Sequence, residues 1–320
     1  MPQKSFAKPK NSTNIRTIIG FLARRSLIRA GFTVAPGWAA RQAATLFLAS
    51  QRRPTGLRQQ PASHATPFAV EGPVGPVAAW SYGRAGDPAV LLVHGWEDDH
   101  LSWAPLVDRL VEKGYRVLSL DLPGHGRSPA RSRHGRATPI PVLAAGIAAV
   151  AREAVAIGAL PQGGKFQAVI AHSLGGTATL IAATELGLMA ERFAILAAPN
   201  HPRLFASALM QMLKLDRAQV EHVYASIEAI VGRSMDSLYL PPKLRALDAA
   251  GLILHSRDDR TVPLKHSQEN AAGWPRAEFR ILDGLGHRRL ISDPDVQAML
   301  LHFIGAEAPA DSFGLRPDAA

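Results

Sequence analysis

The feature that most constrains this chain is a regular alternation of short apolar segments with helical patterns, which begins near residue 67. Seven apolar segments are predicted strands that end in loops: VAAWSYG, AVLLVHG, YRVLSLD, FQAVIAH, RFAILAAP, LILHS and EFRILD. Several are apolar throughout, as expected of strands buried on both faces. The helical patterns between them lie near 102–113, 138–158, 175–187, 264–273 and 294–304. This alternation predicts an α/β domain over residues 67–306, with a mostly parallel sheet and helices on both faces.

The chain can bury a core of this size, since 47% of its 320 residues are apolar and 19% are charged. One interval interrupts the alternation: about fifty residues with helical patterns near 203–213 and 216–232 separate RFAILAAP from LILHS. Helices inserted there would lie over the carboxyl ends of the strands, where open α/β sheets bind ligands. We therefore expect a small helical lid at about 200–245. Its apolar residues suit either a cover over a substrate or ordinary helix packing: Leu204, Phe205, Leu209, Met210, Met212 and Leu213.

The net charge of +10 belongs to the N-terminal arm, residues 1–60, which holds 11 Lys and Arg and no Asp or Glu. The rest of the chain has 25 basic and 26 acidic residues and is close to neutral. We therefore expect no nucleic-acid partner for the domain. The arm has helical patterns over 14–32 and 35–50, followed by a predicted linker over 51–67. Residues 307–320 are expected to form a C-terminal tail.

The first helical pattern of the arm is amphipathic, because Ile15, Ile18, Ile19 and Leu22 recur at helical spacing. Its longest apolar run ends at Arg24, well short of the ~20 residues that a transmembrane helix needs. The arm could dock on the domain, make peripheral contact with a membrane, or serve in targeting. We expect a cytoplasmic protein, either free or peripheral at the inner face of a membrane. The oligomeric state is left open.

The loops that follow the predicted strands carry the residues suited to chemistry. AVLLV is followed by His94-Gly95-Trp96-Glu97, and FQAVI by Ala171-His172-Ser173-Leu174-Gly175-Gly176. LILHS is followed by Asp258 and Asp259, and EFRIL by a loop with His287. A serine needs a positioned base to act as a nucleophile. His287 lies on a glycine-flanked loop, whereas His266 and His302 fall within helical patterns.

These loops, in this order and at these spacings, resemble the α/β-hydrolase superfamily, in its serine-nucleophile branch. The resemblance covers residues 67–306 and implies an α/β-hydrolase fold with a Ser-Asp-His order of catalytic residues. It implies Ser173 as nucleophile, His287 as base and Asp259 as the acid, since Asp259 begins an Asp-x-x-Val-Pro pattern. The adjacent Asp258 is the alternative acid. The backbone N–H groups of Trp96 and Leu174 would form the oxyanion hole.

The turn at Ser173 matches a nucleophile elbow, in which crowding demands small residues two positions before and after the serine. Gly175 meets this demand, and Ala171 replaces the usual glycine. The other loop residues have structural interpretations. We expect His94 and His125 to hold loops and His172 to pack or hydrogen-bond beside the serine. The acidic residues of EDDH, 97–100, are expected to cap a helix and not to bind a metal.

The predicted function is hydrolysis of a carboxylic ester or related acyl bond in a small-molecule substrate, through an acyl-enzyme. A serine at the elbow argues against the branches of the superfamily that use a carboxylate nucleophile. The chain has no cysteine, dinucleotide-binding fingerprint, P-loop or HExxH motif, so we expect neither a cofactor nor a metal. Two alternatives stay open: an acyltransferase or perhydrolase with the same triad, and a non-catalytic binding protein on this fold.

Overall fold

The computed structural model of the chain describes residues 15–50, 60–131, 136–160 and 164–306, with side chains described from residue 19 onward. Within these residues eight strands form one sheet in the order β1-β2-β4-β3-β5-β6-β7-β8. Their bounds are β1 Thr66–Val70, β2 Val77–Tyr82, β3 Ala89–Val93, β4 Arg116–Leu120, β5 Lys165–His172, β6 Met189–Leu196, β7 Ala250–Ser256 and β8 Ala277–Leu282. The pairings of β1 with β2 and of β2 with β4 are antiparallel, and the others are parallel. The predicted mostly parallel sheet is confirmed.

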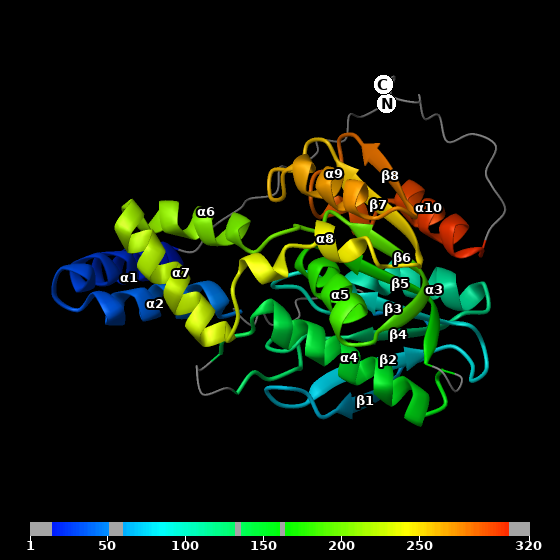
Figure 1. Ribbon diagram of the computed structural model, residues 1–320. Helices are drawn as coiled ribbons and strands as arrows, with labels where there is room; N and C mark the ends of the chain where they lie inside the picture. Colours follow the sequence, from blue (N-terminus) through cyan, green and yellow to red (C-terminus); the bar gives the residue numbers. More distant parts are fainter. Residues whose placement is uncertain (1–14, 51–59, 132–135, 161–163, 307–320) are drawn as a thin grey trace, which may run out of the picture.

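Helices cover both faces of this sheet, as the alternation predicts (Figure 1). Their bounds are α3 Ala104–Glu112, α4 Ile140–Ala156, α5 Ser173–Glu185, α9 Leu264–Gly273 and α10 Pro294–Ile304. Successive residues of a strand point to opposite faces. Leu91 and Val93 of β3 accordingly join the core under α4 and α5, while Val90 and Leu92 join the core under α3 and α10. Burial on both faces is the reason why these strands are apolar throughout.

Strand β1 was not predicted, because Thr66–Val70 falls at the end of the segment expected to be a linker. It is an edge strand with only Val70 fully buried, so it lacks the apolar run that marks the inner strands. Pro67 also weakens its sequence signal, although proline is tolerated on an edge strand, where one side of the backbone has no strand to pair with. The sheet therefore begins at Thr66, just before the predicted domain boundary.

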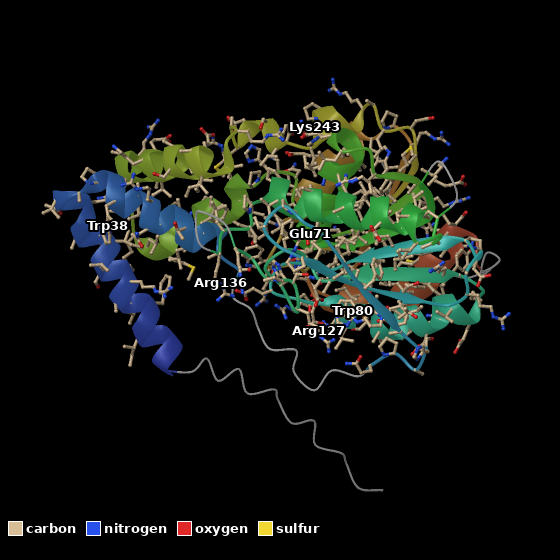
Figure 2. The ribbon with its side chains drawn as sticks, turned by 90° about the horizontal axis from the view of Figure 1, so that it is seen from below. Trp38, Glu71, Trp80, Arg127, Arg136 and Lys243 are labelled. Atoms are coloured by element: carbon tan, nitrogen blue, oxygen red, sulfur yellow. The ribbon has the colours of Figure 1, made fainter. Side chains whose placement is uncertain are left out.

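The N-terminal arm forms helices α1 (Ile15–Val34) and α2 (Pro36–Leu48), which pack against the helices of the predicted insertion, α6 (Arg203–Leu213) and α7 (Arg217–Val231). We call α1, α2, α6 and α7 together the helical cap. Figure 1 shows the cap at one end of the molecule, away from α3 and α10. Figure 2 likewise places Trp38 of α2 far from the strand that carries Trp80. The arm thus docks on the insertion and not on the faces of the sheet.

Small side chains allow α2 to approach α7 closely. Ala40, Ala43 and Ala44 are buried in one apolar cluster with Val223 and Ile227 of α7. The end of α2 is also tied to the α/β domain, since the Leu48 carbonyl accepts a hydrogen bond from the amide of Thr138 (2.8 Å). The Ser50 hydroxyl donates to the Gly124 carbonyl (2.7 Å). These bonds fix the position of α2 relative to the sheet.

The orientation of α1 differs from the expected stripe. Ile19 is 60% exposed and Leu22 is 41% exposed, whereas Ile28 is buried in the cap. The side chains of Ile15 and Ile18 lie outside the described residues. No helix in the described part of the chain is both long and apolar enough to cross a bilayer. The predicted compartment and membrane contact stay predictions, and the expected tail 307–320 lies outside the described residues.

Three short helical segments and α8 complete the connections that the structure describes. Their bounds are η1 His100–Trp103, η2 Asp236–Leu238, α8 Pro241–Leu244 and η3 Arg289–Ile291. The segment η2-α8 returns the chain from the cap to the sheet, with Leu238 and Leu244 buried in the core under α4 and α5. The interval between β6 and β7 therefore leaves the sheet at its carboxyl edge, forms α6 and α7, and comes back to the core.

Candidate active site

Ser173 lies at a sharp turn between strand β5 and helix α5. The strand ends at His172, the helix begins at Ser173, and the serine has φ +54°, in the left-handed region that non-glycine residues rarely adopt. A Cβ atom on Gly175 would overlap the carbonyl oxygen of His94, so a glycine is required there. Ala171 is buried and fits with its single methyl group. The turn has the geometry of the predicted nucleophile elbow.

The ring of His287 lies between Ser173 and Asp259. Its Nε2 is 2.9 Å from the Ser173 hydroxyl oxygen, and its Nδ1 is 2.7 Å from Asp259 Oδ2. A carboxylate can only accept here, so Nδ1 carries a hydrogen and donates it to Asp259. In the neutral ring Nε2 is then free to accept the serine proton. The three residues predicted from the loops are thus brought together in a chain of two hydrogen bonds.

Asp259, and not Asp258, is the carboxylate that meets His287. Its other oxygen, Oδ1, accepts from the amides of Thr261 (2.7 Å) and Val262 (2.9 Å). Burial alone would raise the pKa of Asp259, but the hydrogen bonds from His287 and these amides lower it below its ordinary value. Asp259 is therefore ionised at neutral pH and oriented toward the imidazole.

The alternative acid, Asp258, turns away from the imidazole. Its Oδ1 accepts from the Ser256 hydroxyl (2.5 Å) and from the amide of Gly286 (3.0 Å), so it holds the loop that leads to His287. These hydrogen bonds lower the pKa of Asp258, first that from Ser256 and then that from Gly286. Asp258 therefore holds this loop in place and makes no hydrogen bond to the His287 ring.

The predicted amide donors lie beside the serine. Leu174 is the second residue of α5, and the first four N–H groups of a helix have no partner within the helix. Trp96 lies on the loop after β3, and both residues line the cavity that contains Ser173. Glu97, next to Trp96, has φ +55°, which marks a tight turn of this loop. The oxyanion role of both amides stays a prediction.

The histidines around the site hold it in place. His172 donates from Nε2 to the carbonyl oxygen of His287 (2.9 Å), which matches the expectation that it hydrogen-bonds beside the serine. Burial, followed by the nearby His287, lowers the pKa of His172 to about 3, so its ring stays neutral. His94 bridges two loops, with Nδ1 2.7 Å from the Gly95 carbonyl and Nε2 2.9 Å from the amide of Leu122.

A second imidazole beside Asp259 was missed from the sequence. His255 is buried near the end of β7, with Nε2 3.5 Å from Asp259 Oδ2. Its ring nitrogens are 2.7 Å from the Ser267 hydroxyl and 2.9 Å from the Val262 carbonyl. Because both partners are local, His255 supports the loop that carries Asp259. Its only sequence signal was a polar residue within an otherwise apolar strand.

The acidic segment 97–100 and the loop after β4 make structural hydrogen bonds. The Asp99 side chain caps η1 by accepting from the amide of Leu101 (3.0 Å), as predicted. Asp121 accepts from the amides of His100 (2.9 Å) and Arg127 (2.7 Å), which joins the two loops. Burial opposes ionisation of Asp121, but the bond from His100 and the other contacts lower its pKa.

A cavity of about 570 Å³ opens against Ser173, within the range of small-molecule sites. The loops supply its polar lining, which includes Thr261, His287 and Arg288, and the helical cap supplies apolar side chains. Arg289, the neighbour of Arg288, instead donates to the carbonyls of Leu285 (3.1 Å) and Gly284 in its own loop. The cavity lining therefore combines polar residues from the loops with apolar residues from the helical cap.

This combination of a parallel sheet, a strained serine after β5 and loop-borne Asp259 and His287 defines an α/β-hydrolase. The profile of the alpha/beta hydrolase family matches residues 90–299. The chain belongs to the alpha/beta hydrolase family and is a hydrolytic enzyme. Helices α1 and α2 lie outside the matched residues.

Similar proteins that are named for an activity support this assignment. A pimeloyl-[acyl-carrier protein] methyl ester esterase of Xanthomonas campestris is 28% identical over 263 residues, 69% of this chain and 96% of the relative. A non-heme haloperoxidase of Rhodococcus erythropolis is 28% identical over 265 residues, 70% of this chain and 93% of the relative. An esterase of Pyrococcus furiosus shares the fold, with a TM-score of 0.60, 15% identity, and coverage of 80% of this chain and 97% of that one.

Proposed function

We propose that this enzyme hydrolyses a carboxylic ester or related acyl bond through Ser173, His287 and Asp259. The observation that carries the proposal is the unbroken hydrogen-bonded chain from Asp259 through His287 to the strained Ser173. A nucleophile joined to a base, and the base to an orienting acid, is the arrangement used in acyl transfer by a serine, and this supports the proposal. The Xanthomonas relative is a methyl ester esterase, which supports the same reaction class.

In the first half-reaction the Ser173 oxygen attacks the ester carbonyl carbon while His287 Nε2 takes the serine proton. The amides of Leu174 and Trp96 would donate hydrogen bonds to the oxyanion that forms. Removal of one such donor typically costs ~10²–10³ in turnover. The tetrahedral intermediate then collapses, His287 gives the proton to the departing alcohol oxygen, and the acyl group stays on Ser173.

In the second half-reaction water replaces the alcohol. His287 Nε2 takes a proton from the water, whose oxygen attacks the acyl carbonyl carbon. Collapse returns the proton to Ser173 and releases the carboxylic acid. Asp259 stays ionised throughout and stabilises the imidazolium that forms twice. Transfer to an acceptor other than water shares every step up to the acyl-enzyme and stays the alternative, which the products would reveal.

The test is ester turnover by matched variants. With p-nitrophenyl butanoate, we expect Ser173→Ala and His287→Gln each to lower kcat by about 10³-fold or more, since members of a triad act as a unit. Circular dichroism should show that both variants are folded. A folded Ser173→Ala variant that keeps wild-type turnover would contradict the proposal. Product analysis in water alone and with added alcohol separates hydrolysis from acyl transfer.

A further inference from the structure

The lining of the cavity at Ser173 differs in chemistry between the loops and the helical cap. Its charged and polar lining residues belong to the loops around the sheet, whereas the lining residues of the helical cap are all apolar. The cap contributes Phe21 from α1, Leu46 and Phe47 from α2, and Phe205 and Leu209 from α6. A ligand that matches this lining has a polar group at Ser173 and an apolar chain that extends into the cap.

The N-terminal helices are a fixed wall of this cavity. The alanines of α2 pack on α7, and the Thr138–Leu48 and Ser50–Gly124 hydrogen bonds hold its end against the domain. Leu46 and Phe47 lie in the last turn of α2, directly before these bonds. They are therefore held at the cavity by the same contacts that dock the helix.

The direction of a bound ester follows from the position of the base. His287 must protonate the departing alcohol oxygen, so the alcohol lies on the side of His287. Two polar lining residues neighbour the triad in the chain: Thr261 lies two residues after Asp259, and Arg288 directly follows His287. The acyl chain is then left with the apolar end of the cavity, between the two N-terminal helices and α6 and α7.

We propose that α1 and α2 complete an acyl-chain subsite, which makes this enzyme selective for esters of extended aliphatic acids over acetyl esters. The inference rests on the proposed function and adds the substrate class to it. The wall comes from residues that precede the part of the chain matched by the family profile. The selectivity is thus built by an element that lies outside the profile match.

The measurement is kcat/KM for p-nitrophenyl acetate, butanoate, octanoate and dodecanoate, below their aggregation limits. A buried methylene contributes enough to raise kcat/KM about threefold to fourfold until the cavity is full. Octanoate has six more methylenes than acetate, of which a flexible chain buries only part fully, so we expect octanoate to exceed acetate on the order of 10- to 100-fold. Octyl acetate, whose chain is on the alcohol, should show no such gain. Equal rates for octanoate and acetate would overturn the inference.

Two substitutions on α2 test the role of the N-terminal helices. Leu46→Glu places a charge in the subsite and should lower the octanoate-to-acetate ratio at least tenfold. Gln42→Glu adds the same charge one turn earlier, at an exposed position outside the cavity lining, and should keep the ratio. Leu46→Trp stays apolar but takes up volume, and should shift the best substrate toward shorter acyl chains.

Labelling of Ser173 by a small phosphonate separates the two possible failures. If Ser173 is labelled and esters are cleaved, but Leu46→Glu and Leu46→Trp keep the wild-type chain-length profile, the acyl-chain subsite is wrong and the proposed function stands. If Ser173 is not labelled and no ester is cleaved, the proposed function fails and the subsite with it. Labelling of Leu46→Glu at the wild-type rate shows that the variant has an intact reacting end.

Discussion

The Nδ1 atom of His287 lies 2.7 Å from Oδ2 of Asp259, while the adjacent Asp258 hydrogen-bonds the Gly286 amide instead. Two neighbouring carboxylates thus have different partners, one the ring and the other the loop that carries the ring. This difference arises because Asp259 is turned inward by the amides of Thr261 and Val262.

The two carboxylates should therefore respond differently to the same substitution. Asp259→Asn is expected to lower kcat by about 10³- to 10⁴-fold, because the amide no longer stabilises the imidazolium and favours the wrong tautomer of His287. Asp258→Asn keeps an acceptor oxygen for Gly286 and should cost less than about tenfold. Steady-state kinetics on one ester measures both. The opposite order of effects would assign the acid to Asp258.

Two glycine substitutions test the crowding at the elbow. Gly175→Ala is expected to destabilise the protein by several kcal/mol or abolish activity, since its Cβ would overlap the His94 carbonyl. Gly37→Ala is the control: Gly37 lies in α2 with no neighbouring atom near a Cβ, so alanine should be neutral or stabilise by up to ~1 kcal/mol. Urea unfolding compares them. Equal stability of the two variants would show that the elbow tolerates a side chain.

The burial of His125 should make the stability of the fold sensitive to acid. Burial first, and then the nearby His94, lowers the pKa of His125 to about 3 from an unfolded value of ~6.5. Between these values the unfolded chain binds a proton that the native state does not, so the free energy of unfolding falls as the pH is lowered below ~6.5. The loss is roughly 1 kcal/mol per pH unit, and it vanishes above that pH.

His125→Asn keeps a donor for the Pro123 carbonyl, which the native ring reaches at 3.0 Å, but cannot titrate. We expect its free energy of unfolding to fall less steeply than that of the wild type between pH 6.5 and 4.5. The difference in slope should correspond to about one proton fewer bound on unfolding. His172 titrates identically in both proteins and cancels. Urea unfolding at four pH values gives the slopes. Parallel slopes would mean that His125 is charged in the native state.

Membrane contact through the arm stays a prediction, now placed on one face of α1. Ile19, Leu22, Leu27 and Val34 are exposed there, Val34 by 84%, and the exposed Arg24 and Arg29 flank them. No acidic residue precedes Glu71, so this apolar face with its basic border complements an anionic bilayer.

The test is binding to vesicles of phosphatidylcholine with and without phosphatidylglycerol, measured by co-sedimentation. We expect binding to the anionic vesicles only, weakened at least tenfold by Leu27→Glu. The control Ile157→Glu changes an exposed apolar residue outside the cap and should leave binding unchanged. If Leu27→Glu binds anionic vesicles as well as the wild type does, this face of α1 is not a membrane surface. The same conclusion follows if the wild type sediments as a dimer that Leu27→Glu dissociates, because a second copy would then cover this face.

The reacting end of the site was predictable because its signals are local. A strand, a serine and Gly175 in fixed order leave few other geometries. The choice of Asp259 over its neighbour came from the resemblance, since the family places its acid in an Asp-x-x-Val-Pro pattern. The cap was not predictable in this detail. Helix α1 has apolar residues on two sides, so the periodicity of Ile19 and Leu22 could not show that Ile28 faces inward.

Long-range partners were likewise hidden from a single sequence. The pattern predicted α2 and the insertion as separate helices, but nothing in it pairs Ala43 with Val223 or brings Phe47 to the cavity at Ser173. Strand β1 was missed because an edge strand buries little and so carries a weak alternation. Such features depend on contacts between distant segments, which local propensity does not encode.

The most direct test of the account is the site of covalent labelling by a fluorophosphonate, read by mass spectrometry of the digested protein. The account predicts one adduct, on Ser173, formed rapidly by the wild type, slowly by Asp259→Asn, and not at all by folded Ser173→Ala. An adduct on another residue, or equal labelling of Ser173→Ala, would contradict the assignment of Ser173 as the nucleophile.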